Sequence, residues 1–72
     1  IDVRLAQRLL ALAGGGAEVF ATHQQLASEL GSAREVISRV LQDFQKRGLI
    51  VQSRGRISLA DAGALKAIAE SP

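Results

Sequence analysis

The 72-residue chain contains no cysteine, methionine, tryptophan or tyrosine, and its aromatic residues are two phenylalanines. Without cysteine it has neither a disulfide framework nor a thiolate metal site, which fits a reducing compartment. No apolar run approaches the roughly 20 residues that span a membrane, and no signal-peptide pattern opens the chain. These absences exclude a disulfide-rich scaffold and favour one small domain with an aliphatic core.

The sequence also lacks a recognisable catalytic constellation. The single histidine, His23, is expected in the exposed first turn of a helix, where it suits a surface position or a phosphate contact better than general-base catalysis. No histidine and carboxylate cluster has metal-ligand spacing, and no Gly-x-Ser-x-Gly motif appears. The glycine triplet at residues 14–16 has neither the preceding strand nor the following lysine of a phosphate-binding loop. The chain is therefore predicted not to be an enzyme and to hold no metal or cofactor of its own.

Residues 22–47 carry the signals of two short helices separated by a tight turn. Each helix is preceded by a capping-box pattern, in which a hydroxyl side chain and a residue three positions later satisfy backbone groups reciprocally. Gly31 stands where the first helix, predicted at residues 23–30, needs a left-handed residue to end. The second helix is predicted at residues 33–47, and the pair is typical of a helix-turn-helix. The two capping-box matches are Thr22-x-x-Gln25 and Ser32-x-x-Glu35.

The second of these helices has one apolar and one polar face when its residues are placed at 100° steps. The apolar arc comprises Val36, Ile37, Val40, Leu41 and Phe44, and the polar face comprises Arg34, Glu35, Ser38, Arg39 and Gln42. Arginine suits guanine O6 and N7, glutamate suits cytosine N4, and serine or glutamine is more permissive. The alternative is a solvated helix face with an i,i+4 ion pair between Glu35 and Arg39.

Basic charge is concentrated on this helix and on the segment that follows it. Residues 34–56 contain six basic and two acidic side chains, whereas the rest of the chain contains three basic and five acidic ones. Such an asymmetry is expected of a surface that meets a phosphate backbone. Residues 49–59 are predicted to form a β-hairpin whose turn is Arg54-Gly55, and Val19–Ala21 is predicted to join it as a third strand. Arg54 and Arg56 then lie at the tip of the hairpin.

Two further helices complete the predicted architecture. Residues 2–13 are expected to form the first helix, with Asp2 as its N-cap and leucines at positions 5, 9 and 12, and Asp61 is expected to cap a last helix. The fold class is therefore mainly α with a small antiparallel β-sheet. The order helix, strand, helix, helix, hairpin, helix is that of a winged helix-turn-helix. The whole chain, 1–72, is predicted to be this one domain, with its wing at 49–59.

This architecture gives each polar segment a role on double-stranded DNA. The second helix of the helix-turn-helix lies in the major groove, the N-terminus of the first faces a phosphate, and the wing contacts the backbone. A winged helix used for protein–protein contact is the alternative function. For Glu35, the alternative to base contact is to fold back onto the Ser32 N–H. Predicted base contacts are Arg34, Glu35, Ser38 and Arg39, and predicted backbone contacts are Thr22, His23, Gln24, Ser32, Arg54 and Arg56.

The turn between the two central helices, together with the start of the second, resembles the recognition-helix signature of the Crp/Fnr family of bacterial transcription regulators. The matching run is Gly31-Ser32-Ala33-Arg34-Glu35-Val36-Ile37-Ser38-Arg39. The resemblance extends over nearly the whole chain, which is similar to the family's C-terminal DNA-binding domain. It implies that Arg34, Glu35 and Arg39 match the family's base-reading residues. Ala33 and Val36 depart from the usual hydroxyl residues at their positions.

The resemblance also implies a half-site and partners. The Glu-x-x-Ser-Arg spacing is similar to the Fnr branch, which reads TTGAT, whereas the additional Arg34 is similar to the catabolite-activator branch, which reads TGTGA. Family members carry an N-terminal effector domain and a dimerisation helix, so we expect the chain, which begins at Ile1, to be a fragment of a longer regulator. The expected protein is a cytoplasmic homodimer on palindromic DNA, with RNA polymerase as a candidate partner, no membrane association, and its effector bound outside this chain.

Overall fold

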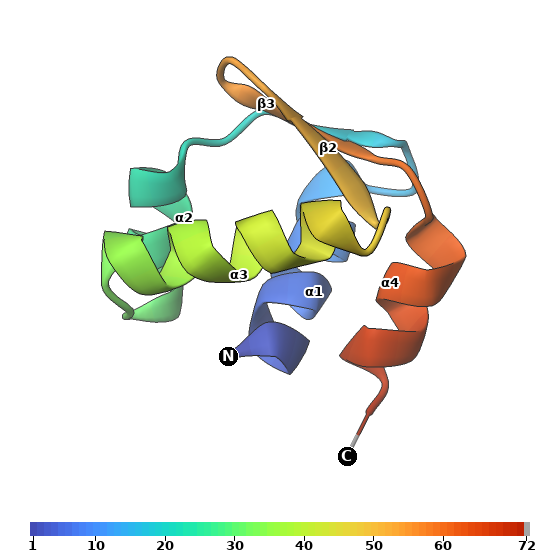
Figure 1. Cartoon of the computed structure of the whole chain (residues 1–72), viewed down its shortest axis with the longest axis horizontal. Coiled ribbons are helices and arrows are strands. Elements are labelled where there is room, and N and C mark those ends of the chain that lie inside the picture. Colours follow the sequence, from blue (N-terminus) through green and yellow to red (C-terminus); the bar gives the residue numbers. More distant parts are fainter. Residues whose placement is uncertain (72) are drawn as a thin grey trace.

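The computed structural model describes residues 1–71, and within them four helices surround one side of a three-stranded antiparallel sheet (Figure 1). The predicted order of elements is confirmed, and the fold is a winged helix-turn-helix. In chain order the elements are α1 (Asp2–Ala13), β1 (Glu18–Val19), α2 (His23–Leu30), α3 (Arg34–Lys46), β2 (Ile50–Ser53), β3 (Arg56–Leu59) and α4 (Ala62–Ala69).

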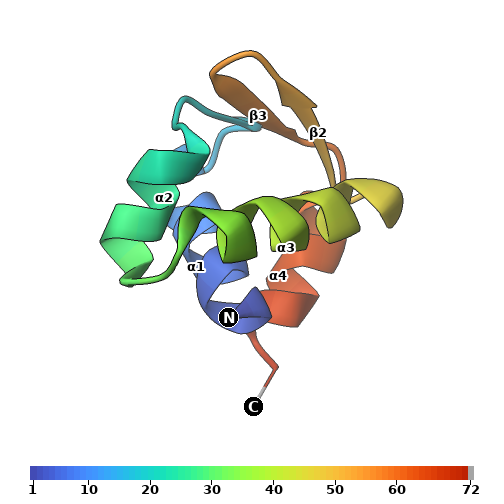
Figure 2. The same ribbon diagram turned by 60° about the vertical axis from the view of Figure 1, so that its left-hand side comes forward.

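The β2–β3 hairpin projects beyond the helices on the side of the molecule where α2 begins, as Figures 1 and 2 both show. Helix α3 crosses α1, and its N-terminal end lies beside α2. The N-terminus and the end of α4 lie away from the hairpin tip. The start of α2, the start of α3 and the hairpin tip therefore face the same region of solvent.

The sheet has the strand order β1-β3-β2, so that β3 is its central strand. Ser53 pairs with Arg56 across the turn, and Val19 pairs with Ile57 on the other edge. The predicted third strand is therefore confirmed, but it begins one residue earlier and is shorter than Val19–Ala21. Phe20 leaves the ladder with 75% of its surface exposed, because the chain must turn there to enter α2.

The turn between α2 and α3 is closed by backbone hydrogen bonds around Gly31, whose φ of 64° is left-handed. The predicted capping box at Thr22 is confirmed: Gln25 N donates to Thr22 Oγ1 at 3.1 Å, and Thr22 N donates to Gln25 Oε1 at 2.8 Å. The second capping box was wrong. Ser32 N donates to Ala27 O at 2.9 Å to finish α2, so Ser32 still belongs to the end of that helix.

Helix α3 consequently begins one residue later, with Ala33 as an N-cap that offers no side-chain hydrogen bond. The prediction of Asp2 as an N-cap was also wrong. Leu5 N donates to Ile1 O at 2.8 Å, which makes Ile1 the cap and leaves Asp2 in the first turn, where a negative charge suits the helix dipole. The prediction for Asp61 is confirmed, since Ala64 N donates to Asp61 Oδ1 at 3.0 Å.

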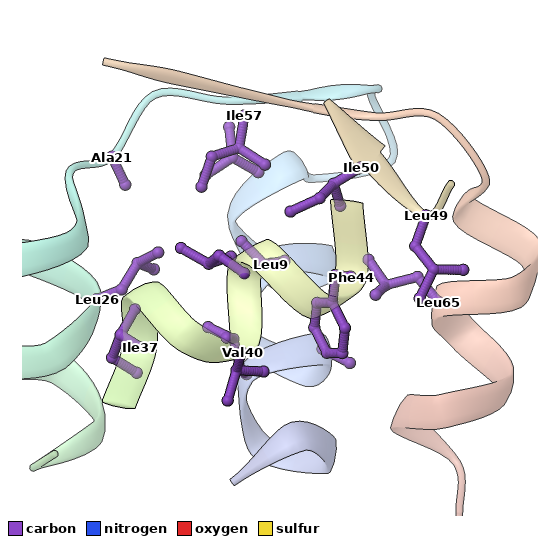
Figure 3. Packing of buried hydrophobic residues seen from close by; sticks show 14 of the residues in the cluster. Leu9, Ala21, Leu26, Ile37, Val40, Phe44, Leu49, Ile50, Ile57 and Leu65 are labelled. Carbon is purple, nitrogen blue, oxygen red and sulfur yellow. The ribbon is translucent and has the colours of Figure 1, made fainter. Parts of the chain in front are cut away.

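One hydrophobic core joins the helices and the sheet, and the side chains in Figure 3 converge on it from all of these elements. Four of the five residues in the predicted apolar arc of α3 are buried, whereas Val36 remains 37% exposed. On α1 the buried stripe runs through Leu5, Ala6 and Leu9 and stops before Leu12, which is 39% exposed. With its apolar side committed to the core, α3 must turn its polar side to solvent.

Candidate nucleic-acid interface

The polar face of α3 is open to solvent along its first two turns. Arg34, Glu35 and Arg39 are exposed, and Ser38 is half-buried. Within residues 1–71 no side-chain hydrogen bond or ion pair engages any of the three charged residues. Neither alternative considered for Glu35 is therefore present here: it forms no pair with Arg39 and does not fold back onto Ser32. These charged groups are available to a ligand without breaking an internal contact.

His23, the first residue of α2, is half-buried and hydrogen-bonded at both ring nitrogens, and the expectation of an exposed histidine was wrong. Its Nδ1 lies 2.7 Å from Ser38 Oγ on α3, and its Nε2 lies 2.7 Å from Gln52 Oε1 on β2. Gln52 N in turn donates to Gln45 Oε1 on α3 at 2.9 Å. One imidazole thus links α2, α3 and the wing.

Gln52 and Gln45 were not anticipated from the sequence as part of this region. Their contribution depends on how β2 is placed against α3, which no local pattern encodes. The alternation of buried and exposed residues along β2 was the one available signal, since Ile50 is buried and Gln52 points the same way along the strand. That signal indicates a half-buried glutamine and does not identify its partner.

A hollow of about 290 Å³ lies between the start of α2, the start of α3 and the wing. Side chains predicted to contact bases and side chains predicted to contact the DNA backbone meet in this hollow. Because α2 begins here, its first backbone N–H groups and the positive end of its dipole favour an anion at this place. Ser32 does not line the hollow. The predicted residues that do line it are Thr22, His23, Gln24, Arg34 and Arg56.

The two wing arginines differ in their surroundings. Arg56 Nε lies 3.1 Å from Glu18 Oε2 of β1, and both side chains are about half exposed. Arg54 is exposed at the hairpin turn, and no ion pair holds it in the described part of the chain. At the far end of α3, Arg47 is paired with Asp43 at 2.9 Å. Arg34, Arg39 and Arg54, which pair with no carboxylate of residues 1–71, lie in the first half of α3 and on the wing.

Residues 3–68 match the family of the Crp-like helix-turn-helix domain. The chain belongs to this family. The resemblance to Crp/Fnr regulators is thereby confirmed, and the family is one of DNA-binding transcription regulators. Within residues 1–71 no helix is long and apolar enough to cross a membrane, and no group of three or more potential metal ligands gathers there.

Two transcriptional regulators are similar to this chain in sequence. The transcriptional regulator SdrP of Thermus thermophilus is 41% identical over 51 residues, which cover 71% of this chain and 25% of that protein. The transcriptional regulator LdrP of the same species is 36% identical, and the match covers 92% of this chain and 38% of that protein. The chain thus spans between a quarter and two fifths of the length of these relatives.

Solved structures of Crp/Fnr regulators share the fold closely. A transcriptional regulator of the family from Eubacterium rectale superposes with a TM-score of 0.94 at 41% identity, covering 99% of this chain and 34% of its own. The catabolite activator protein of Thermus thermophilus gives a TM-score of 0.85 at 31% identity over 94% of this chain and 33% of its own. The winged helix-turn-helix seen here is therefore the form that the Crp-like domain takes in its relatives.

Proposed function

We propose that this Crp-like domain reads a palindromic operator as one half of a dimeric bacterial regulator, with α3 in the major groove. The observation that carries the proposal is the start of α3: three exposed charged side chains, without partners among residues 1–71, lie beside a hollow formed by the α2 N-terminus and the wing. The half-site is of the TTGAT or TGTGA type. As a DNA-binding regulator the protein acts in the cytoplasm, where the DNA lies.

The proposed contacts fall into two groups. Arg34, Glu35, Ser38 and Arg39 face base edges, where arginine is suited to guanine and glutamate to the cytosine amino group. A phosphate occupies the hollow, held by the backbone N–H groups of His23 and Gln24 and by Arg56, while Arg54 contacts the backbone further out. Thr22 holds the α2 N-terminus in place through its capping box, and Ser32 is assigned a phosphate at the start of α3.

The remaining parts of the proposal concern the whole regulator. The effector binds outside these 72 residues, and RNA polymerase is a candidate further partner. Because an isolated domain has one half-site contact, it is expected to bind more weakly than a dimer, in which the second contact benefits from a high effective concentration. Equal affinities of the isolated chain and of a dimer for the same palindrome would contradict the dimeric arrangement.

Titration of fluorescent duplexes carrying the TTGAT palindrome, the TGTGA palindrome or a scrambled sequence tests the proposal at two salt concentrations. Arg39→Ala is expected to cost about 1–3 kcal/mol on the preferred palindrome and little on the scrambled duplex, because a base contact carries sequence information. Arg54→Ala is expected to weaken all duplexes alike and to flatten the salt dependence by about one phosphate contact.

Lys66→Ala is the matched control, because it removes a basic residue from α4, where Lys66 is paired with Glu70 at 3.9 Å. It is expected to leave the preference between the duplexes unchanged. Equal losses on the preferred and scrambled duplexes for Arg39→Ala would remove Arg39 from the base contacts. Absence of binding to any duplex, even at low salt, would favour a protein-contact role for the domain instead.

A further inference from the structure

The hydrogen bonds of His23 determine where the proton of the Ser38 hydroxyl lies. Both ring nitrogens are engaged at 2.7 Å, Nδ1 with Ser38 Oγ and Nε2 with Gln52 Oε1. A carboxamide oxygen only accepts hydrogen bonds, so Nε2 must donate to Gln52. A neutral imidazole has a single N–H, so that Nδ1 is then an acceptor. The Ser38 hydroxyl therefore donates its one proton to His23.

Gln52 is itself held in a defined position. Its backbone N–H donates to Gln45 Oε1 on α3 at 2.9 Å, and Gln52 lies opposite Ile57 in the β2–β3 ladder. The backbone of Gln52, whose carboxamide oxygen accepts from His23, is thus held both by the sheet and by α3. With both ring nitrogens occupied, the His23 ring has no nitrogen left for DNA, so the ring can act on a base edge only through Ser38.

We propose that His23 is a positioning residue that fixes the hydrogen-bonding polarity of Ser38. This inference rests on the proposed function, in which Ser38 meets a base edge in the major groove. A hydroxyl whose proton is committed to His23 presents only lone pairs to the DNA. It accepts from adenine N6 or cytosine N4, and it cannot donate to thymine O4 or to guanine O6 and N7. One base position should therefore show a preference for adenine or cytosine on the strand that Ser38 faces.

The size of this preference follows from a single hydrogen bond to a neutral group. Such a bond contributes about three- to tenfold in affinity, and the mismatch of two acceptors facing one another acts in the same direction. A free serine would show a smaller preference, because its hydroxyl can rotate to donate or to accept. The preference is thus a signature of the His23 contact and is not expected from serine alone.

Two substitutions of His23 separate its two contacts. His23→Asn places an amide near the position of Nδ1, where its oxygen can accept from Ser38, but it does not reach Gln52. His23→Gln reaches the position of Nε2 and the wing but removes the acceptor from Ser38. The assay selects bound duplexes from a pool in which one half-site of the palindrome is randomised, followed by sequencing, using the 72-residue chain and each variant. Thermal unfolding followed by circular dichroism verifies that each variant is folded.

The wild-type chain is expected to show the adenine-or-cytosine preference at one position, and Ser38→Ala should remove it at that position alone. His23→Gln should remove the same preference, and should add nothing further in the Ser38→Ala background, whereas His23→Asn should retain most of it. Gln52→Leu keeps His23 but removes the acceptor that fixes its tautomer, so it should reduce the preference partly. If a His23 variant does not fold, Gln52→Leu tests the inference in its place.

Several results would overturn the inference. These are an unchanged preference in both His23→Gln and Gln52→Leu, a loss in His23→Asn as complete as in His23→Gln, and a loss spread over all positions. The last result is the one expected if His23 only holds the fold together. Failure of the proposed function is distinguishable: the wild-type chain would then bind no duplex, or would bind all members of the pool equally.

Discussion

Replacing Glu18 by glutamine is expected to strengthen DNA binding, because it releases Arg56 from an ion pair. Glu18 Oε2 lies 3.1 Å from Arg56 Nε, and the two side chains are 45% and 46% exposed. In the proposed complex Arg56 faces a phosphate, so it must exchange the carboxylate for that phosphate. Glutamine retains the size and the acceptor oxygen of glutamate but not its charge, and Arg56 then reaches the phosphate without losing a partner.

The structure bounds the expected gain. An exposed ion pair contributes about 0.2–1 kcal/mol, so its removal from the free protein should raise affinity at low salt by about 1.4- to fivefold. Each phosphate contact contributes about −0.9 to the slope of log affinity against log salt. If Arg56 gains a full contact, the slope steepens by up to that amount, and a fourfold rise in salt then costs about 3.5-fold more affinity than in the wild type. Stability should change by less than about 1 kcal/mol.

Fluorescence anisotropy of a labelled palindromic duplex at low and moderate salt measures both quantities. Glu70→Gln is the matched control, because it makes the same change in net charge on α4, where Glu70 is paired with Lys66 at 3.9 Å. Equal gains in the two variants would show that only the overall charge acts. Weaker binding by Glu18→Gln would mean that the ion pair holds Arg56 in its binding position, and would refute a competition between Glu18 and the phosphate for Arg56.

Substitutions at three further positions test the fold by urea unfolding. Gly31→Ala should lower the free energy of unfolding by about 1 kcal/mol. A Cβ at this position meets nothing within 4 Å, so only the left-handed backbone conformation is penalised, by about 1–2 kcal/mol. Part of this penalty is offset because alanine reduces the conformational entropy of the unfolded chain. Gly31→Asn should cost less, and a loss above about 3 kcal/mol for alanine would contradict an open turn. Asp61→Ala should cost about 1 kcal/mol through its cap, and no loss would show that the cap is dispensable. Phe44→Ala, at a fully buried site, should cost about 3–5 kcal/mol, and a loss below about 2 kcal/mol would contradict tight packing there.

The helix-turn-helix could be predicted closely because its signals are local. Apolar periodicity indicated α3 to within one residue at each end, and the Thr22 box and Gly31 gave the bounds of α2. The same local reasoning was wrong at Ser32. A capping pattern shows which hydrogen bonds a residue could make. Here the end of α2 and the start of α3 compete for Ser32, and its backbone N–H is bonded to Ala27 O at the end of α2.

The environment of His23 could not be predicted for a different reason. Its partners are 15 and 29 residues distant in the chain, on α3 and β2. Their approach depends on the packing of the hairpin against α3, which the shared core determines and no short motif contains. Periodicity alone could place the predicted base contacts on one face of α3. That the Ser38 hydroxyl is already hydrogen-bonded to His23 could be seen only in the tertiary structure.

The packing of α1 has a consequence for how such a domain can be controlled. Leu5 and Leu9 of α1 lie in the same core as Ile37 and Phe44 of α3, and the N-terminus and the end of α4 lie away from the hairpin tip. Because α1 shares this core, a rotation of α1 would carry α3 with it. In the proposed dimer, two such domains on one duplex would place their helices in major grooves about 34 Å apart. A change in the angle between them is then sufficient to abolish binding while each domain stays fully folded.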